Sequence, residues 1–317
     1  ESDRVRPQSG LAFADHVWEY QMEGYAQTRF TAVFLTHSPE RVGSVRSIRL
    51  IDINELAEMY GGMLVTSGSS SNRLAGGPPR INELLRAKDF RPWTINADFG
   101  FDEPYLVRIP DVPRVGTPFY HSLFAVPEEI WAWAEEEGHN VRQNLDGMAF
   151  DFTPPPDGIE TTRVWIDYPG RGPEHFWDWD ADSGRWLSFT RHELSPDELT
   201  PDGDTLLPDE QLAFDNVVIL FAEHYNADFI EDEAASLFSV ETVLKGTGNA
   251  VLMRDGQRYN ITWQRDEARQ MLSFFDVNGQ PIAFKPGTTW FNVASTTFGP
   301  PTIEFTPSPD GEADNDG

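Results

Sequence analysis

The chain has 317 residues, 39% of them hydrophobic and 13% aromatic, so it carries enough apolar side chain for sizeable cores and does not have the composition of a disordered protein. Aspartate and glutamate outnumber lysine and arginine by 52 to 24, and the net charge of −28 disfavours nucleic acid and anionic lipid surfaces as general partners. The absence of cysteine excludes disulfides, thiolate metal sites and a cysteine nucleophile.

No transmembrane segment is expected, because no apolar run approaches the ~18 residues that a spanning helix requires. The longest run, Val217 to Ala222, has the length of a strand. The sequence starts at Glu1 rather than at methionine. A cleaved signal peptide would explain that start, and so would a trimmed chain.

The first half of the chain carries both helix and strand signals. β-branched and aromatic residues predict strands at 28–36 and 63–66. Good helix formers predict a helix from Asp52 to Tyr60, which two glycines end, and another at 127–138, where a proline suits the first turn. This succession is typical of a mixed α/β unit.

The second half reads as mostly antiparallel β structure. Asp255-Gly256 and Asn278-Gly279 are two-residue turn signals between strand-like runs and predict hairpins. The stretch from Asp178 to Gly184 lacks the glycine and glutamate positions of a calcium loop, so a hairpin turn is expected there. The acidic stretch 197–210 predicts a solvated insertion.

Residues 153–158, Thr-Pro-Pro-Pro-Asp-Gly, suit neither a helix nor a central strand and form the best domain boundary. We therefore expect an α+β protein in four parts. These are an N-terminal mixed α/β domain at 1–152, a proline-rich linker at 153–160, a β-rich domain at 161–300 and an acidic tail at 301–317.

Functional residue types are densest near the N-terminus. The candidate general acids or bases are Asp15, Glu19 and Glu23, and the candidate ligand-binding residues are Arg6, Ser9, Thr28, Arg29, Arg46, Ser47 and Arg49. If residues 14–23 form a helix, the three acids share one face, since they are four residues apart. If the segment is extended, Asp15 and Glu19 still share one side.

Three interpretations of this cluster stay open. The carboxylates and guanidinium groups could hold an anion, a sugar or a metal ion around a shared hollow. They could instead be a solvated helix face with ordinary surface pairs, or buried ion pairs that build the domain core. The histidines form no metal-binding motif and no nucleotide-binding fingerprint occurs, so we predict no metal site and no cofactor.

Several blocks of the sequence resemble the YerB-like lipoproteins of bacteria, a family with two domains of unknown function. The blocks in the first half are Arg6 to Leu11, Ala14-Asp15, Glu19, Glu23-Gly24, Thr28 to Phe30 and Val42 to Arg49. Those in the second half are Asn216 to Val218, Gly246 to Gly248, Arg254 to Gly256, Thr262-Trp263, Phe275-Asp276, Gly279 and Pro286 to Trp290. The chain departs from the family pattern at Ser44, where the family has proline, and at the loop from Thr66 to Ser69, where the family has a histidine.

The resemblance implies an extracytoplasmic protein of the cell envelope, secreted or held by a lipid anchor on a cysteine before Glu1. It supplies no reaction. We expect a binding or assembly protein whose partner is an envelope protein or a glycan. The alternative is a hydrolase or transferase that acts on a cell-wall or other anionic glycan through the N-terminal carboxylates and arginines.

Overall fold

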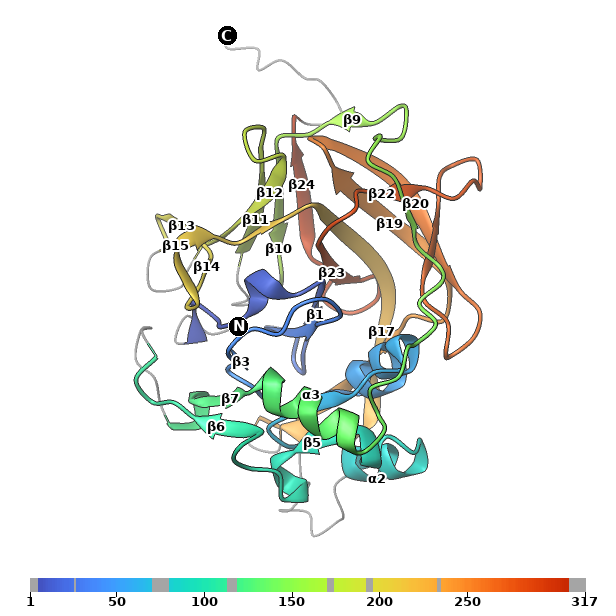
Figure 1. The fold of residues 1–317 in the computed structure, drawn as a ribbon. Helices are drawn as coiled ribbons and strands as arrows, with labels where there is room; N and C mark the ends of the chain where they lie inside the picture. The colour runs from blue at the N-terminus through green and yellow to red at the C-terminus, as the bar shows by residue number, and fades with distance from the viewer. Residues whose placement is uncertain are drawn as a thin grey trace.

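The computed structural model describes residues 5–25, 27–69, 80–112, 119–169, 174–191, 196–232 and 235–307. Strands predominate within these ranges, and the helices are few and short (Figure 1). The chain therefore has a largely β fold with limited α content.

The larger sheet draws its strands from both ends of the chain. Within the described residues it contains nine strands, β1 (His16–Gln21), β2 (Thr28–Val33), β9 (Ile159–Glu160), β17 (Asn216–Asp232), β18 (Leu237–Val243), β19 (Gly246–Arg254), β20 (Gln257–Arg265), β21 (Ser273–Phe275) and β23 (Thr289–Ser295). The main path runs β2-β1-β23-β17-β19-β20-β21, while β18 pairs with β17 and β9 with β20. Because β1 pairs in parallel with β23, the first strand lies beside one of the last, and β2 is left at the edge.

A second sheet packs against the first. In the described part of the chain its six strands are β10 (Arg163–Asp167), β11 (Glu174–Asp180), β12 (Arg185–Arg191), β13 (Leu199–Pro201), β16 (Ala213–Phe214) and β24 (Thr302–Thr306). They run in the order β13-β12-β11-β10-β24, with β16 on β12. Residues 302–306, expected in the acidic tail, thus form a strand, and residues 308–317 lie outside the described ranges.

Smaller elements gather around the first half of the chain, with α2 and α3 beneath the sheets in Figure 1. The helical segments are η2 (Leu11–Phe13), η3 (Asp52–Leu56), α1 (Ala57–Tyr60), α2 (Arg80–Ala87), η4 (Arg91–Trp93), η5 (Ala97–Phe99), η6 (Phe119–His121) and α3 (Pro127–Glu136). The small sheets are β3 (Val42–Gly43) with β7 (Leu123–Ala125) and β6 (Leu106–Arg108), β4 (Leu64–Thr66) with β5 (Thr94–Asn96), β8 (Ala149–Phe150) with β22 (Ala283–Phe284), and β14 (Gly203–Asp204) with β15 (Leu207–Gln211).

Alternate residues of the central strands enter two different cores, as the pleat of a strand requires. Val17, Val217 and Trp290 enter the core between the two sheets, where they join Val164 and Trp177 of the second sheet. The central strands β1, β17 and β23 are buried on both faces for this reason, and β17 carries the continuous apolar run from Val217 to Ala222.

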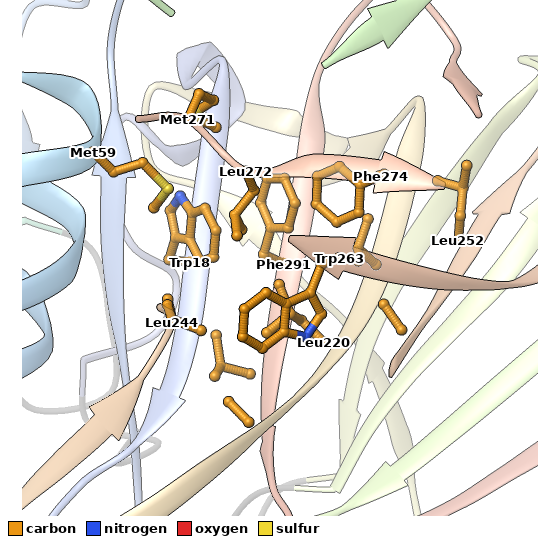
Figure 2. Close-up of a cluster of buried hydrophobic side chains, with 14 of the residues drawn as sticks. Trp18, Met59, Leu220, Leu244, Leu252, Trp263, Met271, Leu272, Phe274 and Phe291 are labelled. Atoms are coloured by element: carbon orange, nitrogen blue, oxygen red, sulfur yellow. The ribbon is translucent and has the colours of Figure 1, made fainter. Parts of the chain in front are cut away.

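The opposite face of the large sheet packs against the helical segment η3–α1. Trp18 stacks on Phe291 with 4.1 Å between ring centroids, and Met59 of α1 lies beside the Trp18 ring (Figure 2). Leu220 and Trp263 extend the same cluster along the sheet. Burial of such large side chains stabilises each by about 1.5–3 kcal/mol relative to exposure, so this core fixes η3–α1 on β1.

Most of the predicted elements are confirmed. The strands expected at 28–36 and 63–66 are β2 and β4, and the expected helices are η3–α1 and α3. The turns at 181–184 and 255–256 close hairpins. The chain also reverses at Asn278-Gly279, but β22 beyond that turn pairs in parallel with β8 rather than with β21.

One alternative is decided and one expectation is wrong. Of the two conformations left open for residues 14–23, the extended one is present, because His16 to Gln21 are the strand β1, buried along its whole length. The acidic stretch 197–210 is not uniformly solvated, since Asp202 and Asp204 are buried. Asp204 accepts hydrogen bonds from the backbone N–H groups of Gly10 and Ala12, at 2.9 and 3.0 Å, and so holds the N-terminal segment.

Candidate functional site

A large cleft opens between the edge strand β2 and the elements of the first half of the chain. Its volume is about 1450 Å³, larger than the ~300–1,000 Å³ of most small-molecule pockets. Four segments form its walls. They are residues 29–35, which include most of β2 and the two residues after it, residues 42–48, residues 60–66 at the end of α1 and beyond, and residues 139–150.

Several apolar side chains of the cleft face water. Leu35, Trp131, Val141 and Phe150 all line it, with exposed fractions of 48%, 36%, 52% and 50%. Large apolar side chains that gather on a soluble protein's surface usually mark a binding site. The cleft therefore offers apolar area that a ligand would cover.

Three guanidinium groups also line the cleft, those of Arg29, Arg46 and the exposed Arg142. Arg29 of β2 donates a hydrogen bond from Nη1 to the Ser47 carbonyl, and Arg46 lies 3.3 Å from Nδ1 of His121. Guanidinium groups bind carboxylate and phosphate with two parallel hydrogen bonds. A positive site of this kind stands out on a chain with a net charge of −28.

Asp52 holds the wall of the cleft that β2 forms. Its carboxylate accepts hydrogen bonds from the Tyr20 hydroxyl at 2.9 Å, from Thr31 Oγ1 at 2.6 Å and from the Arg49 N–H at 2.8 Å. Burial and the Asp52 charge raise the pKa of Tyr20 well above its ordinary value, so the phenol stays a donor. These bonds hold β1, β2 and the start of η3 at a fixed spacing.

The structure separates the residues that the sequence analysis grouped. Ser9, Arg29, Arg46 and Ser47 line the cleft. Asp15, Glu19, Glu23, Arg6, Thr28 and Arg49 are described residues that do not lie among its lining residues. The cleft thus brings together four of the seven predicted ligand-binding residues, and the three acids have separate surroundings.

Glu19 belongs to a buried polar network between the two sheets. Its Oε2 lies 2.9 Å from Nδ1 of His175 and accepts a hydrogen bond from Trp290 Nε1 at 3.3 Å. Arg6 Nη2 contacts Nε2 of His175 at 2.9 Å, and Arg6 Nη1 pairs with Asp202 at 2.5 Å. The charged members are all at most 8% exposed, so the network joins the N-terminal segment, β1 and the second sheet without access to water.

Hydrogen bonding in the network fixes the His175 tautomer. Arg6 can only donate, so Nε2 of His175 accepts and the ring proton sits on Nδ1, the nitrogen that lies 2.9 Å from Glu19 Oε2. Burial alone would raise the pKa of Glu19, but the electrostatic attraction and the hydrogen bond of the adjacent His175, followed by a hydrogen bond from Thr28, bring it below its ordinary value. Burial opposes ionisation of Asp202 as well, yet the Arg6 charge and the hydroxyls of Ser188 and Thr190 lower its pKa.

The other two acids also have structural partners. Asp15 accepts hydrogen bonds from the Leu35 N–H at 2.6 Å and from the Thr36 hydroxyl at 2.6 Å, which fixes the turn after β2. Glu23 forms a two-point pair with Arg49 at 2.6 and 2.9 Å. Although burial raises the pKa of Glu23, Arg49 lowers it below the ordinary value. A general acid at neutral pH needs the opposite shift.

Comparison with known proteins places this arrangement in a family. The profile described as "Protein of unknown function (DUF3048) N-terminal domain" matches residues 1–138, and the corresponding C-terminal domain matches residues 164–291. The protein named "Putative lipoprotein YerB" of Bacillus subtilis (strain 168) is 26% identical over 293 residues, which cover 92% of this chain and 77% of that protein. The chain belongs to the YerB-like family.

The fold is that of the YerB-like family as well. The crystal structure of YerB from Bacillus subtilis superposes with a TM-score of 0.70 at 23% identity, covering 95% of this chain and 90% of that one. Within the described ranges, the helices of this YerB-like chain are too short or too polar to cross a membrane.

Sequence reasoning missed several residues that matter to this YerB-like site. Tyr20 and Thr31 hold Asp52, while His175 and Asp202 complete the Glu19 network. Segment 139–150 supplies a wall of the cleft although it has little regular structure. One signal was available, since the apolar Phe30 and Ala32 alternate with the polar Arg29 and Thr31 in β2, a period that is typical of a strand.

The Arg6–Asp202 pair gives a testable prediction. Arg6→Met leaves the Asp202 charge buried without its partner, which should cost about 3–5 kcal/mol of unfolding free energy in urea. The double variant Arg6→Met with Asp202→Asn should recover most of that loss. Arg163→Met breaks the half-exposed pair with Asp178 and serves as the control, with an expected loss below about 1 kcal/mol. Equal losses for Arg6→Met and Arg163→Met would contradict the network.

The lowered pKa values of Glu19 and Asp202 predict an acid dependence of stability. A carboxyl group with a lowered folded pKa contributes stability that is fully present above its ordinary value, 4.5 for Glu19 and 3.8 for Asp202, and that is lost as the pH falls through the folded value. The free energy of unfolding should therefore fall between about pH 5 and pH 2. Asp202→Asn should show a shallower fall, and an unchanged slope would exclude Asp202 as a contributor.

Proposed function

We propose that this YerB-like protein is an extracytoplasmic binding protein of the cell envelope. Its ligand is elongated and combines apolar groups with a carboxylate or another anionic group. The lipoprotein description of the Bacillus subtilis relative supports the compartment.

The observation that carries the proposal is the joint lining of the cleft. Exposed apolar side chains, among them Val141 and Phe150, lie in the same cleft as Arg29 and Arg46. A ligand that covers the apolar side chains gains about 25 cal/mol per Å² of apolar area removed from water. Each charge-assisted hydrogen bond to a guanidinium group adds about 1.5–3 kcal/mol. A purely apolar ligand would lack the free energy from hydrogen bonds to the guanidinium groups.

The alternative, a glycan hydrolase or transferase that uses the N-terminal acids, receives less support. Glu19 is sealed in the buried network, and Glu23 is paired with Arg49. Asp15 is occupied with the backbone of the turn after β2. We therefore place the function in binding.

A dye with fused apolar rings and a sulfonate, 8-anilinonaphthalene-1-sulfonate, tests the proposal. Native protein should bind the dye with a rise in fluorescence, and the double variant Arg29→Gln with Arg46→Gln should bind it roughly 10-fold more weakly, because the sulfonate loses its charged partners. Arg269 is exposed and lies outside the cleft lining, so Arg269→Gln is the matched control. Native protein that binds no dye, or equal affinity for all three proteins, would overturn the proposal.

A further inference from the structure

The strand β2 presents an unpaired backbone edge to the cleft. It is the terminal strand on the main path of the large sheet and pairs only with β1 among the described strands. Residues 29–35 line the cleft without interruption, so both faces of the strand and the edge between them border it. Residues 29–34 are half-buried, as expected for an edge that nothing fully covers.

The register of the β1–β2 pair identifies the backbone groups that face the cleft. Met22 N–H donates to the Gln27 carbonyl at 2.9 Å, and the strands pair with Tyr20 opposite Arg29 and Trp18 opposite Thr31. In an antiparallel ladder every second pair of opposite residues is hydrogen-bonded. Since Met22 and Gln27 form such a pair, Tyr20 with Arg29 and Trp18 with Thr31 do so too, and the N–H and C=O groups of Arg29 and Thr31 point to β1.

The backbone groups of Phe30 and Ala32 consequently point away from β1. No described residue donates to or accepts from the main-chain groups of these two residues on that side. Exposed edges of this kind are the template for strand addition, and natural proteins usually block them with lysine, proline or a covering loop. In the sequence of β2 neither lysine nor proline occurs.

We infer that the ligand of the cleft is an extended acidic polypeptide that adds to β2 as a further strand, an inference that rests on the proposed binding function. Main-chain bonds to Phe30 and Ala32 would supply affinity, and alternate side chains would enter the two sides of the cleft. A strand of six residues spans about 20 Å at 3.3 Å per residue, which suits a peptide of comparable length.

Charge selects the acidic character of the peptide. Arg29 has its main chain in the β1 ladder and its side chain in the cleft lining, and Arg46 lies on the neighbouring wall. A glutamate or aspartate of the added strand would meet these groups, while its apolar neighbours would cover Leu35 and Phe150. A glycan would satisfy the guanidinium groups but would not use the regular spacing of the edge.

Ala32→Pro removes one outward N–H without touching the β1 ladder, and proline is tolerated at such edge positions. The probe is a pool of random nonapeptides with glutamate fixed at the centre. The best binder is sequenced and resynthesised with N-methyl groups at alternate residues. We expect Ala32→Pro to weaken binding of the unmethylated peptide tenfold or more, with Ala32→Ser unchanged. One of the two N-methyl registers should lose binding to the same degree.

Dye binding separates this inference from the proposed function. A cooperative urea unfolding transition like that of the native protein shows that Ala32→Pro is folded. Native protein that binds the dye but no peptide of the pool would overturn strand addition and leave the binding function standing. Strand addition would also be overturned if polygalacturonate binds and peptides do not, or if both N-methylated peptides bind as well as the parent peptide.

Discussion

The parallel pairing of β1 with β23 is the constraint on which the rest of the structure depends. It runs from His16 opposite Thr289 to Tyr20 opposite Val293 and inserts the start of the chain into a sheet built mostly from its second half. Since β1 is flanked by β23 on one side, β2 can pair only on the other, where the sheet ends. The edge that borders the cleft is thus a consequence of where β1 sits.

The buried polar groups secure that insertion. Strand pairing alone leaves the tilt of the N-terminal segment against the second sheet undetermined, and the Arg6, His175 and Glu19 contacts fix it across the interface. A buried charge without its partner is costly, so few alternative packings satisfy all of these groups together. Asp15, Glu19 and Glu23 therefore serve the fold, and under the proposed function the basic, apolar and backbone groups of the cleft bind the ligand.

Local features were predictable from the sequence, because turn chemistry and strand or helix formers act over a few residues. The turn at Asp255-Gly256 and the segment from Asp52 to Tyr60 are examples. The partner of β1 was not predictable, since it lies some 270 residues away and its choice depends on packing. The burial of Asp202 was hidden for the same reason, as its partner Arg6 is 196 positions distant.

The candidate site was predictable only in part. The density of arginine and hydroxyl residues pointed to the region, and Ser9, Arg29, Arg46 and Ser47 do line the cleft. Composition cannot show which charges are already paired, and Glu19 looks the same in the sequence whether it faces a ligand or His175. The division into domains around the proline-rich segment stays a prediction, while strands from both sides of that segment share the large sheet.

Amide hydrogen exchange, measured residue by residue in the ligand-free protein, tests most directly whether the β2 edge is open. The account predicts rapid exchange for the amides of Phe30 and Ala32, which face the cleft, and slow exchange for Arg29 and Thr31, which donate to β1. Equally slow exchange of all four amides would mean that the edge is already occupied, and would contradict the account.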